Sequence, residues 1–192
     1  MKYLLSLMLS ALTLFGSDAD GEKYQKVPFT VLVDFSKKGT VYETNFQAPW
    51  NIWGSRVEFY LSPYIVWDTS SSEEYKINSY ILHGHPQNIT PYFKIKITLT
   101  PLGWASDDVT INIFNGKEWR YRQEKHYTKG QKIEEIVSIP LYGGDLGLGK
   151  TIMIADLQRL RNYHIRVESL ENVELPKGVK IGFGINRYSR KV

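Results

Sequence analysis

The chain has 192 residues, of which 42% are hydrophobic and 23% are charged, and its formal net charge at pH 7 is +4. A chain of this size and composition can bury a hydrophobic core, and a single domain is the default expectation. It contains no cysteine, which excludes disulfides, thiolate metal sites and a cysteine nucleophile.

The first 19 residues have the pattern of a secretory signal peptide. Lys2 precedes an apolar run over residues 4–15 that is too short to span a bilayer comfortably, and Ser17-Asp18-Ala19 offers small residues for cleavage after Ala19. We therefore expect an exported, periplasmic protein without a transmembrane segment. A polar tether over residues 20–26 would lead into one folded domain over residues 27–192.

The end of the apolar run allows a second interpretation. Leu14-Phe15-Gly16 is the usual lead-in to a lipidated cysteine, but the next residue is Ser17. A membrane anchor at this point would require a native cysteine at position 17.

The first strand signals follow Pro28. Phe29, Val31, Val33 and Phe35 recur at every second position, which is typical of a half-buried strand. Residues 36–39 have turn composition, and residues 40–48 read as a return strand, so the pair predicts a hairpin. Val57, Phe59 and Leu61 predict another strand.

One short helix is predicted near residues 71–83. Ser70-Ser71-Ser72 offers N-cap residues, Glu73-Glu74 supplies an acidic first turn, and Ile77, Tyr80 and Ile81 have helical spacing.

Strand patterns return after Tyr92 and continue to the end of the chain. Asn115-Gly116 is the strongest hairpin-turn signal, and it predicts pairing of the strand around Ile111 with a strand over residues 117–127. About ten short strands without regular β-α alternation predict an all-β fold, an antiparallel β-sandwich of immunoglobulin-like or jelly-roll-like type. The closing strands are expected around Ile165 and Phe183.

Tyr163 lies where a turn enters one of these closing strands. An aromatic residue at that position is similar to the tyrosine corner of immunoglobulin-like sandwiches, whose hydroxyl binds the corner backbone. We therefore expect its ring in the core.

The closing region also carries a family resemblance. The best-matching pieces are Phe35-Ser36-Lys37-Lys38-Gly39, Ile165-Arg166-Val167-Glu168-Ser169-Leu170 and Gly178-Val179. Over residues 27–187 the chain resembles a family of small bacterial cell-envelope lipoproteins whose domain has no assigned function. The resemblance implies a β-sandwich-like fold and an envelope location, and no catalytic residue. Because members of such families are sometimes encoded as antidotes to periplasm-targeted toxins, it suggests the same role by association.

Residues 144–151 match the phosphate-binding pattern G-x-x-x-x-G-K-[ST]. That chemistry needs a long helix after the loop, whose N-terminus meets the phosphates. Here Thr151 opens a short β-rich segment, so we interpret the match as a glycine-rich strand connection. No cofactor is expected.

The sequence contains no recognisable metal-binding or catalytic motif. His83 and His85 could offer two imidazoles to a metal, but no third ligand follows at a recognisable spacing. The chain has no nucleophile elbow and no H-E-x-x-H motif. The acid pairs Asp107-Asp108 and Glu134-Glu135 have ordinary positions for turns and strands, although pairing across the fold remains open. We therefore expect a protein that is not an enzyme.

Two features suggest a binding surface. Residues 117–132 contain six basic residues and two glutamates, and aromatic residues concentrate over residues 50–67, where they would either fill the sandwich core or form an exposed stacking surface. The candidate residues are Arg120, Arg122, Lys129, Lys132, Trp50, Trp53 and Trp67. In an exported protein they would face an acidic protein, a lipid head group or an envelope glycan, and no nucleic acid. The leading hypothesis is a non-catalytic partner of another protein, such as an immunity protein. The alternative is a module that binds glycans or lipid head groups.

Overall fold

The computed structural model describes residues 24–50, 56–65, 92–103, 108–114, 122–140, 150–175 and 179–188. Within these residues the chain forms strands and no helix. The strands are β1 (Gln25–Lys26), β2 (Phe29–Leu32), β3 (Val41–Gln47), β4 (Arg56–Ile65), β5 (Tyr92–Leu102), β6 (Val109–Phe114), β7 (Arg122–Tyr127), β8 (Ile133–Pro140), β9 (Lys150–Asp156), β10 (Asn162–Ser169) and β11 (Val179–Arg187).

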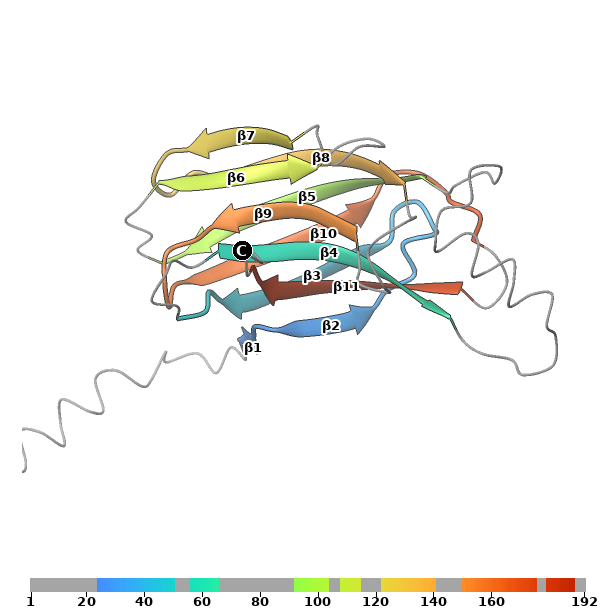
Figure 1. The fold of residues 1–192 in the computed structure, drawn as a ribbon, viewed down its shortest axis with the longest axis horizontal. Helices are drawn as coiled ribbons and strands as arrows, with labels where there is room; N and C mark the ends of the chain where they lie inside the picture. Colours follow the sequence, from blue (N-terminus) through green and yellow to red (C-terminus); the bar gives the residue numbers. More distant parts are fainter. Residues whose placement is uncertain are drawn as a thin grey trace, which may run out of the picture.

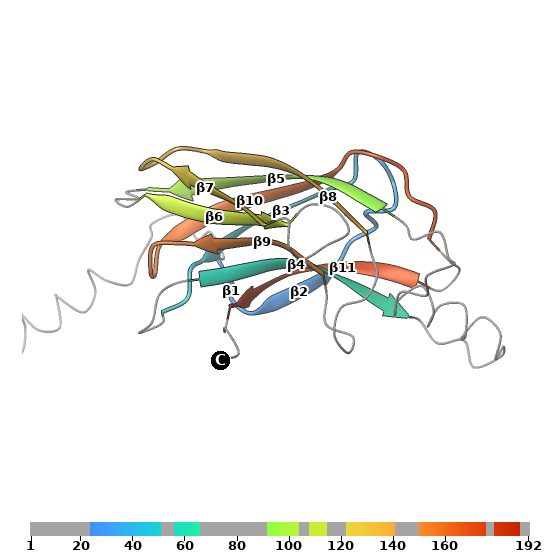
Figure 2. The ribbon, with the colours of Figure 1, turned by 45° about the horizontal axis from the view of Figure 1, so that its top comes forward.

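These strands form two sheets that lie face to face (Figures 1 and 2). The five-stranded sheet has the order β1-β3-β10-β5-β8, and the six-stranded sheet has the order β2-β11-β4-β9-β6-β7. Neighbouring strands are antiparallel except β1 and β3, which are parallel. The predicted all-β antiparallel sandwich is therefore confirmed.

The core fills the space between the inner faces of the two sheets. Its largest fully buried side chains are Tyr163, Phe35, Phe46, Phe59, Phe93 and Phe183. Phe46 of one sheet meets Phe59 of the other edge to face, with 6.1 Å between ring centroids. Each such side chain contributes roughly 1.5–3 kcal/mol when it leaves water, so these contacts account for much of the adhesion between the sheets.

Consecutive strands almost always change sheet. β2 pairs with β11 in the six-stranded sheet, whereas β3 pairs with β10 in the five-stranded sheet. The hairpin predicted for residues 29–48 is therefore wrong. The chain passes from one sheet to the other between β2 and β3, and Phe35 in this connection is fully buried. A period-2 pattern identifies an inner and an outer face but does not say which neighbour completes the sheet.

β6 and β7 are consecutive strands that do pair, as the sequence predicted. Phe114 lies opposite Arg122, whereas a two-residue turn at Asn115-Gly116 would place Phe114 opposite Lys117. The predicted hairpin is confirmed and its predicted register is wrong.

Several expectations lie outside the described residues: the signal peptide over residues 1–19, the helix near residues 71–83, and His83 and His85. At the end of the expected tether, Gln25 and Lys26 form β1. Within the described part of the chain, no helix has the length and apolar character needed to cross a bilayer.

Candidate binding surfaces

The structure describes only part of the predicted binding set. Trp53, Trp67 and Arg120 lie outside the described residues, and Arg122 is described for its backbone alone, as the first residue of β7. The described side chains are Trp50, which follows β3, and Lys129 and Lys132, which lie between β7 and β8.

Trp50 forms an exposed cluster with the turn that joins β9 to β10. Its side chain is 59% exposed, and the Arg159 guanidinium carbon lies 5.7 Å from its ring centroid, a cation–π geometry. Leu160, 50% exposed, and Arg161, also exposed, complete the cluster. We call these four residues the Trp50 tip.

Backbone hydrogen bonds hold the two halves of the Trp50 tip together. The N–H of Ala48 donates to the carbonyl of Arg161 over 2.8 Å, and the N–H of Leu160 donates to the carbonyl of Ala48 over 3.1 Å. Gln47 Nε2 donates to the carbonyl of Leu160. The segment that carries Trp50 is therefore fixed against the turn.

Leu160 has a backbone φ of 55°, in the left-handed region that non-glycine residues rarely adopt. This conformation costs roughly 1–2 kcal/mol, and it persists here because both backbone polar groups of Leu160 are hydrogen-bonded. In this conformation the apolar side chain of Leu160 is half exposed.

The base of the same turn is fixed from inside the core. Tyr163 is fully buried and stacks on Phe46, with 5.9 Å between ring centroids. Its hydroxyl accepts a hydrogen bond from the backbone N–H of Gln158 at 3.0 Å. This confirms the predicted tyrosine corner and makes the Trp50 tip a preorganised feature.

The basic segment over residues 117–132 is partly neutralised by the glutamates that follow it. Lys132 Nζ lies 3.1 Å from Glu134, and Lys125 Nζ lies 2.7 Å from Glu135. The side chain of Lys129 is exposed, while its backbone N–H donates to Asp108. The β7–β8 connection that carries Lys129 lies at the same end of the sandwich as the β9–β10 turn (Figures 1 and 2).

Glu135 is a buried acid that the sequence reasoning passed over as an ordinary strand residue. Its side chain is only 7% exposed and accepts two hydrogen bonds from Lys125 Nζ, each 2.7 Å, and one from the hydroxyl of Tyr127. Lys125 and Tyr127 lie on β7, at the edge of the opposite sheet, so the cluster ties the two sheets together. Burial, and secondarily the bond to Glu135, raises the pKa of Tyr127 well above its usual range.

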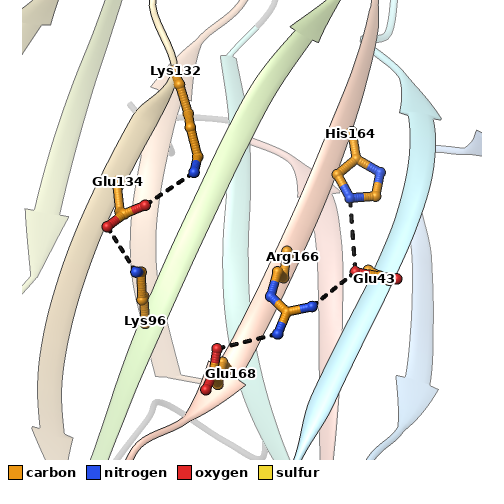
Figure 3. A network of polar contacts seen from close by, with 7 residues as sticks. All are labelled: Glu43, Lys96, Lys132, Glu134, His164, Arg166 and Glu168. Atoms are coloured by element: carbon orange, nitrogen blue, oxygen red, sulfur yellow. Dashed lines mark hydrogen bonds and ion pairs between the residues drawn. The ribbon is translucent and has the colours of Figure 1, made fainter.

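The outer face of the five-stranded sheet is a network of compensated charges (Figure 3). Arg166 forms ion pairs with Glu43 at 3.1 Å and with Glu168 at 3.3 Å. Glu134 forms ion pairs with Lys96 at 2.7 Å and with Lys132. The hydrogen bonds from Lys96 and then Lys132 lower the pKa of Glu134. Such a face is solvated and offers little net charge to a partner.

The outer face of the six-stranded sheet carries two tyrosines of β4. Tyr60 and Tyr64 lean across the neighbouring strand β11 over Gly184 and Gly182, where any side chain would collide with their rings. The hydroxyl of Tyr60 reaches Thr30 Oγ1 on β2 at 2.7 Å. We call these two residues the tyrosine pair.

A cavity of about 460 Å³ lies at the end of the same sheet, where β2 ends and β11 begins. Its apolar lining comes from Leu32, Val33, Leu175, Val179 and Ile181, and its polar lining from Asp34, Ser36 and Lys180. Hydrogen bonds from Ser36 and Lys37 lower the pKa of Asp34 and favour its carboxylate form.

The glycine-rich match ends in a strand. Lys150 and Thr151 begin β9, which pairs with β4 and β6. A strand therefore follows the pattern in place of the helix that phosphate binding of that type requires, which excludes it. Residues 144–149 lie outside the described residues. In the described part of the chain, no three His, Asp or Glu side chains gather as a metal site.

Comparisons with known proteins bear on the fold alone. No protein-family model matches the chain, and no curated protein does. A crystal structure of a protein from Sulfurospirillum deleyianum aligns with a TM-score of 0.52 at 13% identity, covering 85% of this chain and 98% of that one. The Tobacco streak virus coat protein dimer aligns with a TM-score of 0.22 at 13% identity, covering 70% of this chain and 90% of that one. The first likeness indicates a shared fold, and the second is too low to support an argument.

Proposed function

We propose that this chain is an exported, non-catalytic protein of the bacterial cell envelope that binds an acidic protein partner through its Trp50 tip. The exposed Trp50 ring, with Arg159 over it, carries this proposal. Tryptophan and arginine are the residues that most often dominate binding energy at protein interfaces. Here both are exposed and adjacent.

Rigidity of the tip favours binding. Side chains and loops that become ordered only in a complex oppose association, whereas a preformed surface avoids that loss. The hydrogen bonds between Ala48 and the turn, and the bond from Gln158 to Tyr163, order this surface in the free protein. The half-exposed Leu160 adds an apolar side chain to this surface.

The charge of this end favours an acidic partner. Arg159 and Arg161 belong to the tip, and the β7–β8 connection, in which Lys129 is exposed, lies at the same end of the sandwich (Figure 1). Basic residues around an aromatic anchor attract an acidic surface over long range and speed encounter. The N-terminal signal pattern and the resemblance to envelope lipoproteins support a periplasmic toxin as the partner and an immunity role for this chain.

The test selects a candidate toxin from the genes that neighbour that of this chain and titrates the purified protein with it. Trp50→Ala should weaken the affinity by roughly thirtyfold, as expected for loss of an interface hot spot. Arg159→Glu should slow association more at low salt than at high salt. The matched control is Ile136→Ala, which removes another exposed apolar side chain from β8, and it should bind normally. Undiminished binding by a folded Trp50→Ala variant would contradict docking at the tip.

A further inference from the structure

We propose a second binding site at the opposite end of the sandwich: the tyrosine pair and the adjoining cavity bind a neutral oligosaccharide. The tip lies at the end where β10 begins, and the cavity lies where β2 ends and β11 begins (Figure 1). This site is independent of the Trp50 tip and of the function proposed for it.

The tyrosine pair is built as an aromatic platform. The two glycines of β11 give the rings room to lie across the strand, and the bond between Tyr60 and Thr30 holds one ring in place. Tyr64 remains 40% exposed. A ring fixed against a sheet loses little conformational freedom on binding, and the apolar C–H face of a sugar packs against such a ring.

The platform and the cavity are continuous. Tyr64 lies directly opposite Lys180, and Gly182 lies directly opposite Leu32. Both Lys180 and Leu32 line the cavity, and Leu32 is 61% exposed. A ligand that packs on Tyr64 therefore reaches the cavity over the side chain of Leu32.

The spacing indicates a chain of sugars. Tyr60 and Tyr64 are separated by four residues along β4, which corresponds to about 13 Å in a strand. The cavity extends the site beyond Tyr64, and its volume is within the range of small-ligand pockets. The site is therefore longer than one sugar ring.

The polar lining favours a neutral ligand. The carboxylate of Asp34 is paired with Lys37 at 2.9 Å and accepts the Ser36 hydroxyl proton, so its charge is compensated, and its remaining lone pairs accept hydrogen bonds from sugar hydroxyl groups. Lys180 adds a donor on the same wall, and the Ser36 hydroxyl oxygen, whose proton is donated to Asp34, adds an acceptor. Hydroxyl groups act as both donors and acceptors, so a saccharide satisfies this mixture better than a lipid phosphate does.

The experiment titrates the full chain with maltohexaose, cellohexaose and chitohexaose and monitors binding by calorimetry and saturation-transfer NMR. At least one should bind at millimolar concentration or below. Tyr64→Ala should weaken that binding by roughly tenfold, Tyr64→Phe should retain it because the ring remains, and Asp34→Asn should weaken it. Tyr92→Ala, which removes a comparably exposed tyrosine from β5 of the other sheet, is the matched control and should leave it unchanged.

Thermal unfolding of each variant shows whether it is folded, and Asp34→Asn, at an exposed side chain, keeps the test informative if Tyr64→Ala is not. Absence of binding by all three oligosaccharides would overturn the proposal, as would binding that survives Tyr64→Ala. Vesicles containing phosphatidylglycerol provide the remaining arm: binding to them that depends on Tyr64, without saccharide binding, would replace the saccharide by a lipid head group.

Discussion

The hydroxyl oxygen of Tyr163 accepts a hydrogen bond from the backbone N–H of Gln158, 3.0 Å away across the β9–β10 turn, which supplies three of the four residues of the Trp50 tip. The ring of Tyr163 is fully buried against Phe46, so this one side chain links the hydrophobic core to the exposed turn. Packing of the core and presentation of the Trp50 tip are therefore coupled.

Tyr163→Phe and Tyr163→Ala should separate these two roles. Loss of the hydroxyl leaves the N–H of Gln158 without this partner and should lower the free energy of unfolding by about 1–3 kcal/mol. Loss of the ring should lower it by about 3–5 kcal/mol. Denaturant unfolding measures both changes. Tyr92→Ala, at a partly exposed tyrosine of β5, is the control and should cost less than either; equal costs for Tyr92→Ala and Tyr163→Ala would contradict the role of the corner.

The sequence predicted the faces of the strands well. In β10, Tyr163, Ile165 and Val167 are fully buried as expected from their alternation, and the corner itself follows from an aromatic residue at a strand entry. Alternation is set by the pleat of a single strand, so it can be read locally. Which strand pairs with which depends on residues far apart in the sequence. The strands β2 and β3, on either side of Phe35, consequently belong to different sheets.

The sites were less predictable because they depend on neighbours across the fold. Glu135 has the same phase as the buried Ile133 and Val137, which was a readable signal that it points inward. Gly182 and Gly184 alternate with Ile181, Phe183 and Ile185, so the sequence places them on the outer face of β11, yet they are buried because tyrosines of β4 cover them. No pattern within β11 contains that information.

Glu135→Ala should destabilise the protein by roughly 2–4 kcal/mol. It leaves the ammonium of Lys125 and the hydroxyl of Tyr127 without their partner at the junction of the two sheets, and the partial exposure of Lys125 moderates the loss. Glu134→Ala is the matched control: it removes the same charge from the preceding residue of β8, on the solvated face, and should cost much less than Glu135→Ala. Denaturant unfolding of the two variants compares them, and similar losses would show that Glu135 has no special role.

Tyr127 should resist ionisation in the folded protein. Its pKa is raised by burial first and by its hydrogen bond to Glu135 second, so the folded state retains a proton that the unfolded chain releases near pH 10. This stabilisation is therefore fully present below about pH 10 and is lost as the pH rises through the raised pKa of the folded state.

Tyrosinate absorbance during alkaline titration measures the effect. Tyr127→Phe should leave the titration of the folded protein unchanged near pH 10, because Tyr127 does not ionise there. Glu135→Gln should allow Tyr127 to ionise at lower pH, since the anionic acceptor is gone. A Tyr127→Phe variant that loses one tyrosinate signal near pH 10 would show that the pKa of Tyr127 is not raised.

Gly182→Ala should destabilise the protein by about 1–3 kcal/mol, the range for overpacking, because the added methyl group collides with the ring of Tyr64. The cost should fall sharply in a Tyr64→Ala background, where the ring is absent, and should remain in a Tyr60→Ala background, whose missing ring covers Gly184 instead. Denaturant unfolding of the single and double variants gives the coupling free energy of each pair. If Gly182→Ala costs the same in all three backgrounds, the ring of Tyr64 does not rest on Gly182 in solution, and the aromatic platform loses its structural basis.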